Sequence, residues 1–240
     1  MTTASKWIIA TGVAGVAMAP ATTVLAQERA SAPPSYFAER VRAPRDAFEL
    51  TVGAGYSQGT MSPAEGVGAM DLTKAGGAAG VQVGYRFTPE FSLNLYGEYN
   101  QFNPGNAVST GAARGGVAGI NGTFHMNPFQ RLDPWVRVGT GYRMLWATGN
   151  PNAVDTLWHG FQLAKVDLGL DLRTNEDVAI GPLIGIDVSH FYWRNPAGAG
   201  GDEEIVGKRF VPFVYAGLEG RFDLGGSRER RSGMKDFASR

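Results

Sequence analysis

Residues that could carry out catalysis or bind a metal are few in this sequence. There are three histidines, His125, His159 and His190, and no cysteine among 240 residues. No two histidines have the H-E-x-x-H spacing of a zinc site, and no G-x-x-x-x-G-K-[ST] phosphate loop occurs. Without cysteine there is no disulfide and no thiolate nucleophile. We therefore expect no metal, no cofactor and no catalytic residue.

The side chains of two residue pairs could nevertheless support catalysis. Asp167 and Asp171 are separated by four positions, which in a strand is about 13 Å at ~3.3 Å per residue, too far for the ~5–9.5 Å of a glycosidase pair. Ser189 and His190 are neighbours, and neighbours in a strand point to opposite faces. A lipid-modifying enzyme would need Ser189 and His190, or His159 and a loop serine, on one face.

The elements that would hold these side chains are strands, because polar and apolar residues alternate in segment after segment. In KVDLGLDLRT, charged Lys165, Asp167, Asp171 and Arg173 alternate with aliphatic residues. Eight such segments follow one another, at 47–57, 81–87, 91–102, 115–126, 135–146, 165–174, 178–193 and 209–222. Connections after the second, fourth and sixth are short, whereas the others are longer and rich in Gly, Pro, Asn and Ser. This asymmetry is typical of an outer-membrane barrel.

Three features favour a membrane barrel over a soluble barrel, which would also alternate. The segments reach about ten residues or more, the length that a tilted strand needs to cross a bilayer. The ionic face is interleaved with glycines such as Gly139 and Gly169, which leave room for long side chains inside a narrow barrel. Aromatic residues collect near strand ends, as expected for two interfacial belts: Phe48, Tyr56, Phe87, Phe91, Tyr99, Phe102, Trp135, Trp146, Phe191, Tyr192, Trp193, Phe210 and Phe222.

The ionic face is expected to line a lumen that is narrow enough for side chains to fill, as in barrels of about eight strands. Six acids and six bases are assigned to it, which predicts mutual neutralisation in an ion-pair network rather than a selectivity ring of one sign. The members are Glu49, Arg86, Glu98, Arg137, Arg143, Lys165, Asp167, Asp171, Arg173, Asp187, Glu219 and Arg221.

The ends of the chain indicate export. Residues 1–26 have one cation, Lys6, then an apolar run and small residues ending in Val24-Leu25-Ala26, as in a cleaved signal peptide. Residues 27–46 are expected to form a periplasmic linker, 47–224 the barrel, and 225–240 a basic C-terminal tail. The chain has 22 basic and 22 acidic residues, which gives no electrostatic footprint for nucleic acid.

With these features the chain resembles the eight-stranded outer-membrane barrels of Gram-negative bacteria, the OmpA-like transmembrane domain and its small-barrel relatives. The resemblance covers residues 47–224 and includes the final strand YAGLEGRF. It implies an all-β, eight-stranded antiparallel up-and-down transmembrane barrel in the outer membrane, with both termini in the periplasm. Such barrels commonly end on an aromatic residue that the insertion machinery reads. Phe222 could serve, although DLGGSRERRSGMKDFASR follows it and departs from that pattern.

We therefore expect a non-enzymatic, monomeric barrel whose lumen is closed by ion pairs and whose surface loops make its contacts. The expected partners are outer-membrane lipid, lipopolysaccharide and the insertion machinery. A narrow passive channel for small solutes is the first alternative, and an outer-membrane lipid-modifying enzyme is the second. Because this fold carries many functions, the fold does not choose among them.

Overall fold

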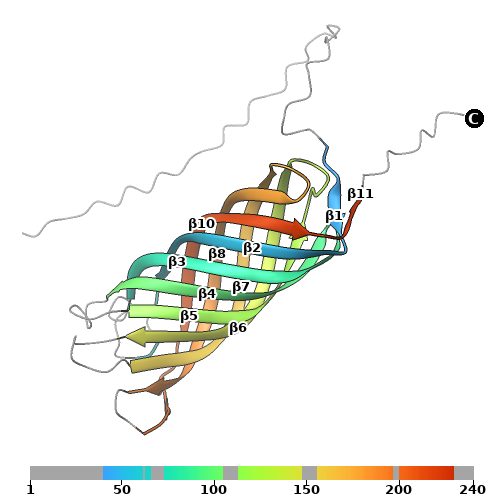
Figure 1. Ribbon diagram of the computed structural model, residues 1–240. Helices are drawn as coiled ribbons and strands as arrows, with labels where there is room; N and C mark the ends of the chain where they lie inside the picture. Colours follow the sequence, from blue (N-terminus) through green and yellow to red (C-terminus); the bar gives the residue numbers. More distant parts are fainter. Residues whose placement is uncertain are drawn as a thin grey trace, which may run out of the picture. The chain divides into compact units, whose positions relative to one another are not determined.

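The computed structural model of the chain contains a closed antiparallel barrel (Figure 1). It describes residues 40–61, 63–65, 73–104, 113–147, 156–196 and 200–229. The barrel strands are β2 (Ala47–Gly59), β3 (Thr73–Thr88), β4 (Phe91–Pro104), β5 (Ala113–His125), β6 (Leu132–Ala147), β7 (Thr156–Arg173), β8 (Val178–Asn195) and β10 (Phe210–Leu224). The predicted fold class is confirmed. No helix in the described ranges is long and apolar enough to cross a membrane.

The barrel has up-and-down topology, in which each strand pairs with the next along the chain. Closure comes from β10, which pairs with β2 on one side and with β8 on the other. Because the sheet closes on itself, neither end strand leaves a row of unpaired backbone groups.

The two faces of the wall are reversed relative to a soluble barrel. Along β7, Lys165 and Asp167 are buried, whereas Val166 and Leu168 have exposed fractions of 38% and 50%. Successive side chains of a strand point to opposite faces, so charge fills the inside and hydrocarbon covers the outside. Aliphatic side chains exposed on the outside include Leu95, Ile120, Val138, Ile184 and Leu218.

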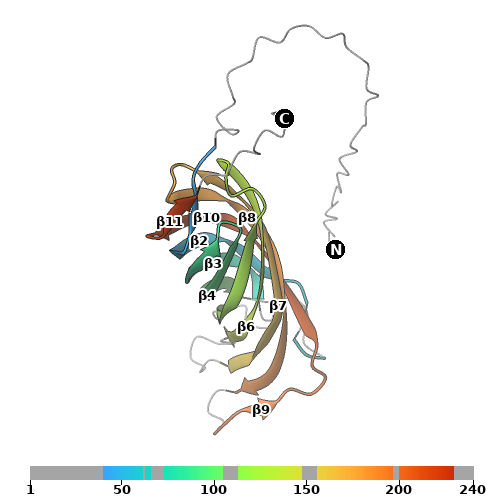
Figure 2. The same ribbon diagram turned by 90° about the vertical axis from the view of Figure 1, so that its right-hand side faces the viewer.

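The two ends of the barrel differ in the length of their connections. Figure 2 shows the barrel turned by 90° from the view of Figure 1. At one end the strands are joined by short turns, such as Pro89-Glu90 between β3 and β4. In the turn between β7 and β8, the Asn175 side-chain oxygen accepts hydrogen bonds from the backbone N–H groups of Asp177 and Val178, both at 2.8 Å. The longer connections lie at the opposite end.

A second, two-stranded sheet lies at the end with the short turns. It pairs β1 (Ala43–Arg45) with β11 (Ser227–Glu229), in the ranges that the sequence analysis treated as linker and tail without assigning strands. The chain leaves β10 through Gly225 and Gly226, both at φ 71°. A Cβ on Gly226 would lie 2.4 Å from the Arg45 carbonyl oxygen, so the turn requires glycine. The termini of the barrel are thereby joined.

Candidate functional site

The lumen is the candidate site, and its layer nearest the short turns is a dense ion-pair network. The guanidinium of Arg86 donates to Glu49 at 2.7 Å, and that of Arg221 lies 2.9 Å from Asp171 and 2.8 Å from Glu219. Arg173 donates to Asp223 at 3.1 Å. All of these side chains are buried, so each charge depends on its partners for compensation.

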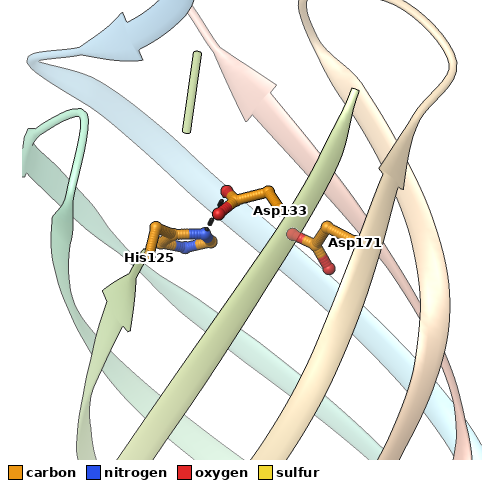
Figure 3. A group of neighbouring side chains, drawn as sticks. All are labelled: His125, Asp133 and Asp171. Carbon is orange, nitrogen blue, oxygen red and sulfur yellow. Dashed lines mark hydrogen bonds and ion pairs between the residues drawn. The ribbon is translucent and has the colours of Figure 1, made fainter. Parts of the chain in front are cut away.

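His125 stands in this layer with Asp133 and Asp171, in an arrangement that could hold a metal ion by its spacing (Figure 3). Arg86 and Arg221 approach the His125 Nε2 atom at 3.0 Å and 2.5 Å. Guanidinium groups can only donate, so Nε2 is the acceptor and Nδ1 carries the proton that it donates to Asp133 at 2.7 Å. A cation held together with Asp133 would need Nδ1 without its proton, and that proton cannot move to Nε2, which faces two guanidinium groups. The site therefore does not fit a metal.

Trp135 packs across the lumen between the layer nearest the short turns and the middle layer. Its indole N–H donates to Asp171 at 2.8 Å, and the Arg137 guanidinium lies 4.3 Å from the centre of its ring. The ring passes over Gly169, where an added Cβ would lie 2.1 Å from a ring carbon. The glycine in the charged face of β7 therefore makes room for this indole.

The middle layer continues the network. The Arg137 Nη2 atom donates to both carboxylate oxygens of Glu219, at 2.9 and 3.0 Å, and Nη1 donates to Asp167 at 3.4 Å. Lys165 donates to Glu98 at 2.8 Å. A cavity of about 30 Å³ remains among these groups, lined by glycines of β2, β3 and β4. That space holds one or two water molecules and no larger solute.

The layer toward the long connections holds one ion pair and several neutral polar side chains, such as Asn100, Gln162 and Ser189. Arg143 donates to Asp187 at 2.7 Å and stacks on the ring of Phe213 at 3.9 Å. Beyond them a cluster fills the lumen, here named the outer plug: Ala64, Phe102, Ala113, Leu145, Trp158, Phe191, Ile205, Val211 and Phe213. Two of its members, Ala64 and Ile205, come from the connections themselves, so the plug joins wall and loops.

These contacts correct two parts of the sequence analysis. Phe102, Trp135 and Phe191 were assigned to interfacial belts, but their exposed fractions are 2%, 1% and 1% because they fill the lumen. Alternation predicted which face of the wall each side chain within a strand occupies. It did not predict the face for these three aromatic residues near strand ends, where a ring can point into the lumen or toward the outside. The remaining belt residues include exposed Phe48, Phe87, Phe91, Tyr56 and Tyr99.

The twelve predicted lumenal residues all lie inside the barrel, and each one has an ion-pair partner. Asp133, Asp223 and His125 join them, and the first two raise the count from six acids to eight against six bases among the described residues. The expected equality of charges is therefore wrong. Neutral donors make up part of the difference, as Trp135, His125 and Ser189 each donate to a carboxylate. Asp133 and Asp223 lie just outside the predicted strand segments 135–146 and 209–222, so the sequence analysis did not assign them to the lumen.

The residues weighed as a hydrolase centre do not form one. Ser189 points inward and donates to Asp187 at 3.1 Å, whereas the His190 ring packs outside against Phe210 at 4.8 Å. The imidazole of His159 bonds to the Tyr142 hydroxyl at 2.5 Å. Residues 55–59 read G-Y-S-Q-G and match the G-x-S-x-G pattern, so the expectation that this pattern is absent is wrong. Ser57 is buried within a continuous strand rather than on a strand-to-helix turn, so it is not an exposed nucleophile.

Outside the barrel wall, two of the long connections contact each other. The backbone of Glu65 donates to Gly207 and that of Arg209 donates to Pro63, at 3.2 and 3.1 Å. β9 (Glu203–Glu204) pairs with the end of β8. The Lys208 ammonium donates to Glu204 at 2.5 Å and lowers the pKa of that carboxyl. Ala64 and Ile205 lie in these two connections and belong to the outer plug, so the described parts of the connections pack onto it.

No protein-family model matches this chain. No curated protein matches it in sequence. Among solved structures, Neisserial surface protein A is 12% identical with a TM-score of 0.50, covering 74% of this chain and 97% of that one. The outer membrane protein OprG from Pseudomonas aeruginosa is 13% identical with a TM-score of 0.45, covering 75% and 98%. The N-terminal β-barrel domain of Pseudomonas aeruginosa OprF is 14% identical with a TM-score of 0.43, covering 75% and 99%.

At such identities the likeness concerns the fold alone. The chain has the fold of the eight-stranded outer-membrane barrels, as the resemblance predicted.

Proposed function

We propose that this chain is an integral outer-membrane barrel with a closed lumen, and that it acts through its surface connections in a structural or surface-interaction role. The observation that carries the proposal is the reversed wall, in which buried charges line the inside and exposed aliphatic side chains cover the outside. In a bilayer that hydrocarbon surface would contact lipid without the free-energy cost of exposing it to water. A monomeric soluble protein rarely exposes a continuous apolar surface of this extent.

The proposal includes a location and an orientation. The eight barrel strands, of 13 to 18 residues, are longer than the ~9–11 residues that a tilted strand needs to cross a bilayer. In bacterial barrels of this kind short turns face the periplasm, which would place both ends of the barrel there. Lipid, lipopolysaccharide and the insertion machinery are the partners that this placement implies, and we propose a monomer.

A closed lumen is supported by what fills it. Ion pairs such as Arg137–Glu219 cross the middle, and the outer plug stands above them. Near the periplasmic end Ala43 and Pro44 of β1 are also buried. Breaking any one buried ion pair leaves an uncompensated charge, which makes the closed arrangement the stable one. The same contacts argue against an enzyme, because the carboxylates and histidine inside the barrel are engaged with one another.

Membrane insertion and closure are tested separately. The mature chain should require detergent for solubility and migrate differently on gels before and after heating; a chain that is soluble without detergent would contradict the membrane proposal. In planar bilayers, wild type, Arg143→Ala and Asp167→Ala should all be electrically silent, with the two variants less stable. Steady conductance whose ion preference changes in these variants would replace the closed barrel by the narrow channel.

A further inference from the structure

The outer wall carries a groove that the closed-lumen proposal does not use. It has a volume of about 540 Å³, within the ~300–1,000 Å³ range of small-ligand sites. Across the middle of it runs a row of paired residues, Leu50 with Val83, Val83 with Leu95, and Leu95 with Ile120. This face of β2, β3, β4 and β5 is turned toward the viewer in Figure 1. We name it the wall groove.

The edge of the wall groove nearest the short turns is a chain of aromatic rings. Phe48 packs edge-on against Tyr85 at 5.4 Å, Tyr85 packs against Phe87 at 5.1 Å, and Phe87 stacks with Phe91 at 6.3 Å. Rings in this position mark the level of the headgroups in a membrane barrel. Leu95 is four residues from Phe91, which is about 13 Å along the strand and, with the tilt of such strands, about 10 Å in depth. The wall groove therefore spans the part of one leaflet's hydrocarbon that lies next to the headgroups.

The lining of the wall groove selects an uncharged, apolar occupant. Apart from Tyr85 of the aromatic edge, the polar residues that border it are Glu49 and Asn94, and both of these side chains are turned into the lumen. Glu49 accepts from Arg86 at 2.7 Å, and the Asn94 amide donates to Asn121 at 3.2 Å. A peptide backbone or a polar ligand would lose its hydrogen bonds with water here without replacement. A hydrocarbon chain would lose none.

The charges next to the wall groove along the chain suit a zwitterionic headgroup. Arg45 and Asp46 precede Phe48, with side chains that are 48% and 55% exposed and 3.3 Å apart. Arg45 also pairs with Glu229 at 2.8 Å. A phosphate can meet the guanidinium while an ammonium group meets the carboxylates, whereas a purely anionic headgroup would face the two acids.

We propose that the wall groove binds one acyl chain of a zwitterionic phospholipid of the periplasmic leaflet. The inference rests on the proposed membrane function, since it needs the wall to face lipid. The site differs from the rest of the lipid-facing wall in holding a particular chain between the aromatic edge and the row from Leu50 to Ile120. Surrounding lipid would only cover the wall.

The test uses protein purified in detergent, washed free of loose lipid and analysed by native mass spectrometry. Palmitoyl-oleoyl phosphatidylethanolamine is the probe added back. Wild type should retain one phospholipid per chain, and Leu95→Trp, which fills the wall groove, should lower the bound fraction at least tenfold. Ile184→Trp is the matched control, because Ile184 is as exposed as Leu95, at 61%, and lies on the far wall. It should retain the lipid.

Four outcomes would overturn the inference. Equal retention by wild type and both variants would mean unspecific surrounding lipid, and no retention by wild type would mean no site. A cross-linked dimer through Val83→Cys that excludes lipid would assign the groove to a second copy. Stronger binding of phosphatidylglycerol than of phosphatidylethanolamine would contradict the headgroup assignment. Detergent dependence and heat-modifiable migration of all variants show separately whether the membrane proposal itself holds.

Discussion

At the scale of single residues, the lumen is organised by contacts that tolerate little change in volume. The clearest is the indole of Trp135 lying over Gly169, with the indole N–H bonded to Asp171. The ring is 1% exposed and is also covered by the guanidinium of Arg137, so it has no free space to move into. Packing at this point depends on the absence of a single methyl group.

Gly169→Ala should therefore destabilise the barrel by roughly 1–3 kcal/mol, the usual penalty for overpacking. The measurement is the free energy of unfolding in urea, in lipid vesicles, followed by tryptophan fluorescence. Gly77→Ala is the control, since a Cβ there would meet nothing within 4 Å. It should be neutral or slightly stabilising. Equal effects of the two substitutions would contradict the packing of Trp135 against Gly169.

A second prediction at this scale concerns the arginines in the lumenal layer nearest the short turns. Arg221 contacts Asp171 and Glu219, and it donates to His125. Arg221→Ala should lower the free energy of unfolding by about 3–5 kcal/mol, because it leaves buried carboxylates without their counter-charge. Arg45→Ala removes an exposed ion pair and should change stability little. A small effect of Arg221→Ala would mean that water enters this layer.

At the scale of elements, the β1–β11 pair is separate from the barrel wall yet fastens its seam. β11 follows β10, β1 precedes β2, and β10 and β2 are the strands whose pairing closes the barrel. Arg228 of β11 also bonds to Asp177 in the turn between β7 and β8. The extra sheet thus links three parts of the periplasmic end as we orient it.

Removal of residues 227–240 should leave a folded barrel that is less stable by about 1–3 kcal/mol, because a few backbone hydrogen bonds worth ~0.5–1.5 kcal/mol each are lost. The readout is the temperature at which the folded band disappears on gels. Removal of residues 230–240 alone keeps β11 and is the control. If both truncations had the same effect, β11 would not fasten the seam.

At the scale of the whole molecule, the reversed wall makes stability depend on what surrounds the barrel. Ile186 is 47% exposed midway along β8 between Ile180 and Tyr192, and Leu224 is 56% exposed at the end of β10. In water, arginine at either exposed position would be tolerated. In a bilayer the cost depends on depth.

Ile186→Arg should cost about 2–4 kcal/mol in vesicles, against about 0–1 kcal/mol for Leu224→Arg near the interface. Both are measured as urea unfolding free energies in the same lipid. The difference should shrink in detergent micelles, which adapt to a charge more easily. Equal costs in vesicles would argue that this wall does not face a bilayer.

The sequence by itself determined the class of fold, because a period of two repeated over eight segments assigns each side chain to one of two faces. For the same reason it identified the twelve lumenal charges before any contact was known. Alternation carries no information about which residues meet across the barrel, since partners such as Arg137 and Glu219 lie on distant strands.

Only the tertiary structure decided what happens at the strand ends and across the lumen. Phe102 and Phe191 turn inward to form the outer plug, and Asp133 and Asp223 enter the ion network. The β1–β11 pair forms from segments with no alternating pattern. In each case the deciding factor is closure of the barrel, which brings together residues far apart in sequence and gives a ring or a carboxylate at a strand end a place inside.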